Sequence, residues 1–191
     1  MAKVHGEFYA PQALFLYGTK RDDGTPNFGL FSWFGYAWID DQLGVMACIG
    51  EEKLTKDLIC RNGVFSLNLV TEELLPLADY YGNTAGRTVA DKMKHLPTIS
   101  WGEVLDVPTI AESPLTLELQ VKQEIVEAGG SSIFLCHIRN TSVDEGLLDP
   151  SVPYIDRYKK CAAVISAGDE TYASVDGRML GKWGEPMKSL Q

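Results

Sequence analysis

Residues 115–121 read Leu-Thr-Leu-Glu-Leu-Gln-Val, in which apolar and polar side chains alternate without a break. Successive side chains of a β-strand point to opposite faces of the sheet, so this alternation predicts a strand with one buried and one solvated face. Such half-buried strands are typical of antiparallel sheets. The segment is the clearest strand predicted in the chain.

Working outward, several other segments carry strand or helix patterns. Apolar or alternating runs predict further strands at 13–19, 27–39, 43–49, 65–69, 133–138 and 161–166. Helices are expected from Thr55 as the N-cap to Gly63, from Thr71 to Tyr81, and as a short piece at 89–95. Residues 82–87 are expected to form a loop, and 144–156 a long connection. We therefore predict a mainly β, α+β fold: an antiparallel β-barrel with short flanking helices, forming one domain over 1–191.

Composition limits the possible functions. The chain of 191 residues has a formal net charge of −9 and 45% hydrophobic residues. The acidity argues against nucleic-acid binding, which needs a basic face. The four cysteines are widely spaced and the three histidines show no ligand spacing, so no metal site is predicted. Residues 1–7 contain no apolar run typical of a signal peptide, and no segment is long and apolar enough to cross a membrane. We expect a cytoplasmic protein.

Two segments suggest a binding site. Residues 27–34, Asn-Phe-Gly-Leu-Phe-Ser-Trp-Phe, combine aromatic side chains with a few polar ones, as a site for a planar heterocycle does. The same aromatics are also what a barrel core contains. Residues 48–56 lead from a strand through Gly50 to a helix N-terminus, where Lys53, Thr55 and Lys56 are potential phosphate donors. An ordinary helix start with solvated lysines has the same pattern.

Ordered motifs along the chain resemble the flavin reductase-like split-barrel family, and within it the flavoredoxin-like branch. The resemblance runs from about Pro11 to Ser166. It rests on Gly18-Thr19, Asn27 through Ser32-Trp33, Thr55 at a helix start, Phe65-Ser66-Leu67-Asn68, Asp79-Tyr80-Tyr81-Gly82, Ala85-Gly86-Arg87 and Asp91-Lys92-Met93.

This resemblance implies FMN, bound noncovalently between the two subunits of a homodimer. It assigns the isoalloxazine ring and ribityl chain to Asn27, Ser32 and Trp33. It assigns the ring edge to the backbone of Cys48, Ile49 and Gly50. It assigns the phosphate to Lys53, Thr55 and Lys92, with Asn83 and Thr84 nearby. Asn68 is expected to be structural, and Asp91 to orient Lys92 or Arg87.

Three positions depart from the family pattern. Ala85 stands where the family has a serine. Gly129-Gly130-Ser131-Ser132 replaces a Gly-x-His sequence that many nicotinamide-using members carry, which argues against NAD(P)H use. His137 stands where an acidic residue is usual, and we expect its side chain to face solvent or a neighbouring strand.

The resemblance leaves three functions open. The chain is expected to act as an FMN-dependent oxidoreductase of the NAD(P)H:flavin type, with no protein acid or base required for the chemistry. The alternatives are a flavoredoxin-type electron-transfer protein without a nicotinamide site, fed by a redox protein partner, and an FMN-binding module with no catalytic activity. One further hypothesis places Cys48 near the flavin, where it would tune the redox potential; a small buried hydrophobe is the simpler interpretation of this residue.

Overall fold

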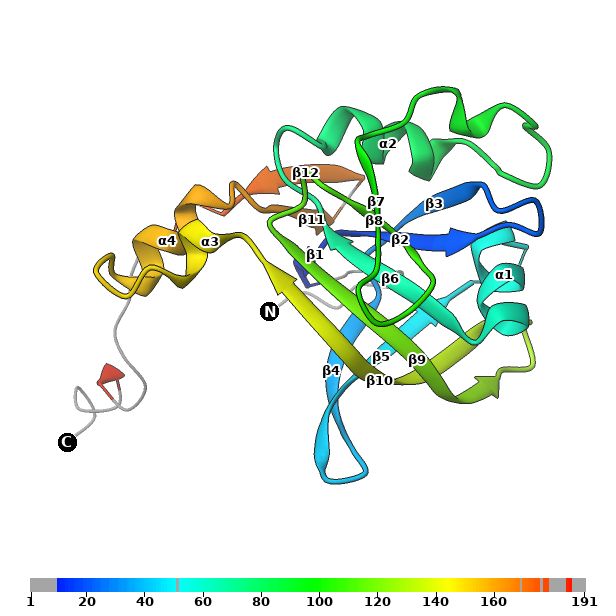
Figure 1. Cartoon of the computed structure of the whole chain (residues 1–191), viewed down its shortest axis with the longest axis horizontal. Coiled ribbons are helices and arrows are strands. Elements are labelled where there is room, and N and C mark those ends of the chain that lie inside the picture. Colours follow the sequence, from blue (N-terminus) through cyan, green and yellow to red (C-terminus); the bar gives the residue numbers. More distant parts are fainter. Residues whose placement is uncertain (1–9, 51, 169, 176, 179–184, 187–191) are drawn as a thin grey trace, which may run out of the picture.

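The structure, a computed structural model, describes residues 10–50, 52–168, 170–175, 177–178 and 185–186 (Figure 1). The prediction about residues 1–7 lies outside these ranges. The strands are β1 Gln12–Ala13, β2 Phe15–Lys20, β3 Pro26–Phe31, β4 Phe34–Ile39, β5 Gln42–Ile49, β6 Val64–Leu69, β7 Ile99–Trp101, β8 Pro108–Ile110, β9 Leu115–Val126, β10 Ser132–Val143, β11 Val164–Gly168 and β12 Thr171–Ser174. The helices are α1 Leu54–Asn62, α2 Leu75–Asn83, α3 Glu145–Leu148 and α4 Tyr154–Lys160, with one 3-10 turn at Lys92–Lys94.

The main sheet has seven strands in the order β3-β2-β6-β9-β10-β5-β4, and all neighbours are antiparallel. A three-stranded sheet, β1-β11-β12, and the β7-β8 pair complete the β-structure. The alternating segment 115–121 forms the first part of β9, at the centre of the main sheet. The predicted antiparallel β-fold is confirmed.

The main sheet curls into a split barrel because its two edge strands follow each other directly in the sequence. β3 ends at Phe31 and β4 begins at Phe34, so only Ser32 and Trp33 separate the edges. Three residue steps span at most about 11 Å, which forces the two edges together. The predicted single strand at 27–39 is therefore two strands, broken where the chain turns from one edge to the other.

The barrel interior holds the larger of two buried apolar clusters. It includes Phe15, Tyr17, Phe65, Leu119 and Phe134, which come from four different strands of the main sheet. A second cluster lies between α2 and the strands β2 and β3, and contains Phe28, Ala78 and Tyr81. α2 thus covers the outer face of β3, and α1 lies at the opposite end of the barrel from α3 and α4 (Figure 1).

Two predicted helix starts are wrong. The N-cap of α1 is Lys53, not Thr55, and it makes no side-chain capping bond. Thr55 is the second residue of the helix, and its hydroxyl accepts a hydrogen bond from the Asn27 side chain. α2 begins at Leu75 with Leu74 as the N-cap, and the Thr71 hydroxyl accepts a bond from the Leu74 amide in the turn before it. The stop at Gly63 is confirmed, with φ of 69°.

The C-terminal third differs more from the prediction. The expected connection at 144–156 contains α3 and the start of α4. The strand expected at 161–166 begins only at Val164, because Cys161 caps α4.

In the middle of the chain, the helix expected at 89–95 is reduced to the 3-10 turn at Lys92–Lys94. In the described part of the chain, no helix is long and apolar enough to cross a membrane.

Candidate functional site

A cavity of about 320 Å³ lies between the start of α1, the edge strand β3 and the end of α2. It brings together residues that lie far apart in the sequence. Five of the predicted site residues line it: Lys53, Thr55, Asn83, Thr84 and Lys92. Gly29 and Gly86 let the surrounding segments approach closely, since a Cβ on Gly29 would lie 2.7 Å from the Thr55 hydroxyl oxygen.

The start of α1 gives this cavity hydrogen-bond donors. An α-helix leaves its first amide N–H groups without partners inside the helix, and a side chain usually caps them. The N-cap of α1 makes no such bond. These donors, the helix dipole and the adjacent Lys53 therefore suit an external anion.

Lys92 is the most unusual charged group of the cavity. Its side chain is 5% exposed, and its ammonium lies 5.8 Å from the centre of the Tyr81 ring. Burial, and then repulsion from Lys53 and Arg21, lowers the pKa of Lys92 to about 8. In the described part of the chain no carboxylate forms an ion pair with it. A buried cation is stable only when an anion or a dipole compensates it, so this arrangement favours a negatively charged ligand.

Asn27 lies behind the cavity wall and not on it. Its side chain is fully buried, and its amide nitrogen donates to the hydroxyls of Thr19 at 3.0 Å and Thr55 at 3.1 Å. Its carbonyl oxygen is buried and has no partner among the described residues. Because the Thr55 oxygen accepts from Asn27, the Thr55 hydroxyl proton is directed elsewhere, and the cavity lies on its open side.

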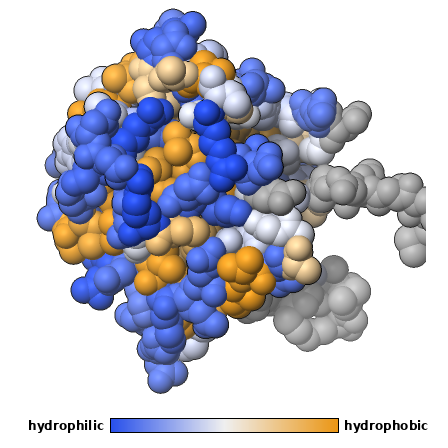
Figure 2. Space-filling model, turned by 90° about the vertical axis from the view of Figure 1, so that its right-hand side faces the viewer, coloured by the Kyte–Doolittle hydropathy of each residue, from blue (hydrophilic) through white to orange (hydrophobic). Residues whose placement is uncertain are grey.

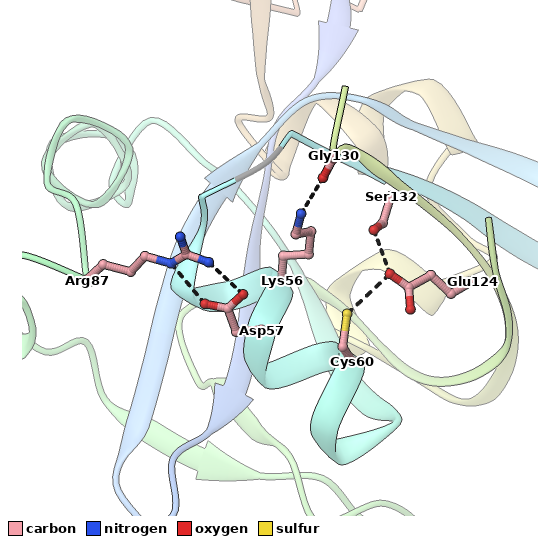
Figure 3. Close-up of polar contacts among 7 residues, drawn as sticks. All are labelled: Lys56, Asp57, Cys60, Arg87, Glu124, Gly130 and Ser132. Atoms are coloured by element: carbon pink, nitrogen blue, oxygen red, sulfur yellow. Dashed lines mark hydrogen bonds and ion pairs between the residues drawn. The ribbon is translucent and has the colours of Figure 1, made fainter. Parts of the chain in front are cut away.

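Contacts on both sides hold α1 in place (Figure 3). Asp57 pairs with Arg87 through two bonds of 2.8 and 2.9 Å, which tie the helix to the loop after α2. Lys56 donates to the carbonyl of Gly130 in the turn between β9 and β10 at 2.5 Å. Lys56, a potential phosphate donor by sequence, is thus committed elsewhere. The partner of Arg87 is Asp57, not Asp91.

A third contact of α1 involves Cys60 (Figure 3). Its thiol donates to Glu124 at 3.3 Å, and Ser132 donates to the same carboxylate at 2.6 Å. Burial, the hydrogen bond and the charge of Glu124 raise the pKa of Cys60 to about 11. The thiol is therefore protonated at neutral pH and acts as a structural donor that joins α1 to the β9–β10 hairpin.

Arg21 is a residue of this region that the sequence motifs do not mark. Two of its guanidinium nitrogens, Nε and Nη2, are buried and have no hydrogen-bond partner among the described residues. Its charge also acts on Lys92. Around this end of the molecule, strongly hydrophilic side chains surround exposed apolar surface (Figure 2). A run of basic residues in one segment would have indicated a cluster of cations, but Arg21, Lys53 and Lys92 come from three separate segments.

The other predicted residues lie beyond this cavity. Ser32 lines a second, adjoining cavity. Trp33 is half exposed, and its carbonyl accepts the Cys48 amide at 2.9 Å, which places the β3–β4 break beside the end of β5. Ile49 is fully buried in the barrel core. Neither Cys48 nor Gly50 lines either of these two cavities.

Two structural expectations are confirmed. Asn68 is buried and bonds to the carbonyl of Leu16 and the amide of Ile110, so it is a structural residue. His137 lies beside Gln42 and Asp40 of the β4–β5 hairpin, at 3.0 and 3.1 Å. Burial, and then the charge of Glu127, raises the pKa of Cys48, so its thiol is not activated in this structure.

Comparisons with known proteins agree with this fold. The structure resembles flavoredoxin from Methanosarcina acetivorans, with a TM-score of 0.83, 23% identity and 100% coverage of both chains. It also resembles flavoredoxin of Desulfovibrio vulgaris, with a TM-score of 0.80 and 28% identity over 97% of this chain and 98% of that one. A protein of Aeropyrum pernix described as uncharacterized is 35% identical over 118 residues, which are 61% of this chain but only 44% of the relative.

The family match covers most of the chain. Residues 8–162 match the flavin reductase like domain. This range contains the edge strand β3, the start of α1, the end of α2 and the buried Lys92, which are parts of the wall of the first cavity. The chain therefore belongs to the flavin reductase like domain family.

Proposed function

We propose that the chain binds FMN, with the phosphate in the first cavity. The observation that carries this proposal is Lys92: a buried ammonium beside Lys53, without a described carboxylate partner, next to the uncapped start of α1. A phosphate dianion would compensate the charges of both lysines and accept hydrogen bonds from the Thr55 hydroxyl and the helix N–H groups. These hydrogen-bond donors and positive charges thus fit the phosphate group of FMN; riboflavin has no such group.

The isoalloxazine ring would extend from this cavity toward the break between β3 and β4. Ser32 and Trp33 would line it, and the backbone of Cys48, Ile49 and Gly50 would meet its polar edge. Asn83 and Thr84 would contact the ribityl phosphate. In this arrangement Asn27 acts through Thr55: it holds the hydroxyl oxygen so that the proton points at the phosphate.

With FMN bound, we propose an oxidoreductase of the flavin reductase type with NAD(P)H as the electron donor. FMN supplies the hydride and electron chemistry. The protein's own residues bind and orient the cofactor, exclude water from the phosphate and leave the half-exposed Trp33 as a wall beside the ring. No acid–base side chain is needed.

A flavoredoxin-type electron carrier, fed by a redox protein and without a nicotinamide site, is the second candidate. The turn between β9 and β10, residues 127–131, favours it, because it holds Gly129-Gly130-Ser131 and no histidine. The 28% identity to a flavoredoxin over nearly the whole chain points the same way. An FMN-binding module without catalytic activity is the third.

We further propose a single-domain, cytoplasmic homodimer with FMN at the subunit interface. The β4–β5 hairpin supports the dimer, because Trp38 is 73% exposed and its cross-strand neighbour Leu43 is 51% exposed. Exposed apolar surface of this kind marks protein–protein contacts. The hairpin extends beyond the barrel (Figure 1), where a second copy can cover it.

The proposed cytoplasmic location is supported by the four cysteines, which are all free thiols, as is usual in a reducing compartment.

The first experiment is a visible absorption spectrum of the purified protein, before and after anaerobic addition of NADH. Flavin bands that bleach with NADH support the reductase. Bands that bleach only with dithionite support the electron carrier. Titration of the flavin-free protein should show that FMN binds at least about tenfold more tightly than riboflavin, because riboflavin has no phosphate group to occupy the first cavity. A tenfold difference in affinity corresponds to about 1.4 kcal/mol. Equal affinity for the two flavins would contradict the phosphate site.

A further inference from the structure

A second cavity of about 480 Å³ adjoins the first. The two share four wall residues: Leu30, Phe31, Gly82 and Asn83. The far wall of the second cavity comes from the C-terminal strands β11 and β12, through Ser166, Thr171 and Tyr172. The two cavities are therefore neighbours along the edge strand β3.

The two cavities differ in charge. The charged residues that line the first are Lys53, Lys92 and Glu52, whereas those that line the second are Asp79 and Glu170. Among the described residues that line the second cavity there is no lysine, arginine or histidine. A small ligand entering it therefore meets negative charge only.

Hydrogen bonds fix Asp79 in this wall. The Tyr172 hydroxyl donates to it at 2.7 Å, and the Asn83 side chain donates to the same oxygen at 3.1 Å. Burial, and then the contact with Asp79, raises the pKa of Tyr172 to about 12, so the phenol is neutral near pH 7. The cavity thus combines a fixed carboxylate with neutral hydroxyl groups.

On the basis of the proposed function, we infer that the second cavity receives the small molecule that accepts electrons from the reduced flavin, and that this acceptor is uncharged or cationic. NAD(P)H, the proposed electron donor, carries a pyrophosphate that would meet Asp79 and Glu170 without a compensating cation from the described wall, so we assign this cavity to the acceptor and not to the donor. Like charges repel such a ligand, while a field of one sign in a cleft attracts the opposite charge and speeds its association.

The test compares two inorganic electron acceptors of similar size: hexaammineruthenium(III), a trivalent cation, and ferricyanide, a trivalent anion. The FMN-loaded protein is reduced anaerobically with stoichiometric dithionite and mixed with each in a stopped-flow instrument. The anionic reduced flavin transfers one electron to each of two acceptor molecules and releases one proton to solvent. The readout is the ratio of the two rate constants at low salt, together with the Kd for FMN.

Asp79→Asn/Glu170→Gln should lower the cation-to-anion rate ratio by about tenfold, because local charge changes association rates by factors of this order or more. Glu170→Gln alone, at an exposed side chain, should give part of that change without affecting folding. The matched control is Glu103→Gln/Glu145→Gln, which removes the same charge from exposed positions outside the cavity and should leave the ratio within about twofold. Reaction with uncharged benzoquinone should not respond to either change.

An unchanged ratio in the cavity variants, with FMN still bound, would overturn this inference alone. A tenfold weaker Kd for FMN in the same variants would also overturn it, because the cavity would then hold the flavin itself. Failure of the wild-type protein to bind FMN would instead remove the proposed function on which the inference rests.

Discussion

The Asn27 side chain donates to the hydroxyl oxygen of Thr55 across 3.1 Å, and this bond links the barrel edge β3 to the first turn of α1. It leaves the Thr55 proton available to the cavity. Because Asn27 is fully buried, the bond is shielded from water and fixes the hydroxyl orientation. The geometry of the proposed phosphate site therefore depends on the barrel as much as on the helix.

Thr55→Val should weaken FMN binding by about tenfold and riboflavin binding much less. The substitution removes one hydrogen bond to the phosphate, and such bonds to charged groups contribute about 1.5–3 kcal/mol. Fluorescence titration of the flavin-free protein measures both affinities. Thr19→Val is the matched control, since Thr19 bonds to the same Asn27 amide without lining the cavity. An equal loss for both flavins would mean that Thr55 only maintains the fold.

Lys92→Met should stabilise the flavin-free protein while it weakens FMN binding by at least tenfold. Burial lowers the pKa of Lys92 to about 8, from the ordinary 10.5. Between these values the unfolded chain binds more protons than the folded one, so this group makes stability rise with pH there and is unfavourable below about pH 8. We expect Tm at pH 7 to rise by about 2–5 °C in the variant. Lys94→Met, at an exposed neighbour, is the control.

The same lysine predicts a pH dependence of FMN affinity. As pH rises from 7 to 9.5 the Lys92 ammonium of the free protein loses its proton, while the FMN phosphate, with a second pKa of about 6, stays a dianion. Wild-type affinity should therefore fall over this range and that of Lys92→Met should stay flat. Parallel profiles for the two proteins would place the titrating group elsewhere.

Glu118→Gln should destabilise the fold by about 1–3 kcal/mol at pH 7, measured by urea unfolding. The buried carboxylate accepts the amides of Glu103, Val104 and Leu105 and the side chain of Asn140, and an amide group cannot accept all of them. This pattern anchors the loop before β8 to the centre of the main sheet. Glu103→Gln is the control, because only the backbone of Glu103 takes part.

The effect of Glu118 should disappear in acid. Burial alone would raise the pKa of Glu118, but the bonds from Asn140, Leu105, Glu103 and Val104 outweigh it and lower the pKa below 4.5. The stabilisation is therefore complete above that value and is lost as pH falls through the folded-state pKa. A wild-type advantage that persists well below this pKa would contradict the assignment.

Trp38→Lys should convert the proposed dimer into a monomer and weaken FMN binding with it. A lysine at the exposed tip of the β4–β5 hairpin places a charge in the apolar contact and removes a large aromatic anchor of the kind that carries binding energy. Sedimentation velocity gives the mass. Trp101→Lys, at another exposed tryptophan, is the control. A dimer that persists in Trp38→Lys would move the interface away from this hairpin.

Local patterns were enough to predict most of the barrel. The alternation at 115–121 and the runs at 43–49 and 65–69 are strands in the structure, and Gly63 ends α1 as its position indicates. The break inside 27–39 was not visible, because aromatic residues continue across Ser32 and Trp33. Only the need to join both sheet edges explains the turn there. Thr55 was misassigned as an N-cap because its true partner, Asn27, is 28 residues away.

The sequence by itself determined the β-class of the fold and its family and suggested the residues proposed to bind phosphate, because each depends on local side-chain periodicity or on motifs at fixed spacing. Tertiary structure alone decided that Lys53 and Lys92 share one cavity, that the charge of Arg21 acts on Lys92, and that Asp79 and Glu170 line the next cavity. These residues lie on separate elements. The strength of an electrostatic interaction depends on the distance between the charges. For these residues that distance is set by the curling of the sheet and by the packing of α2 and β12 near its edge.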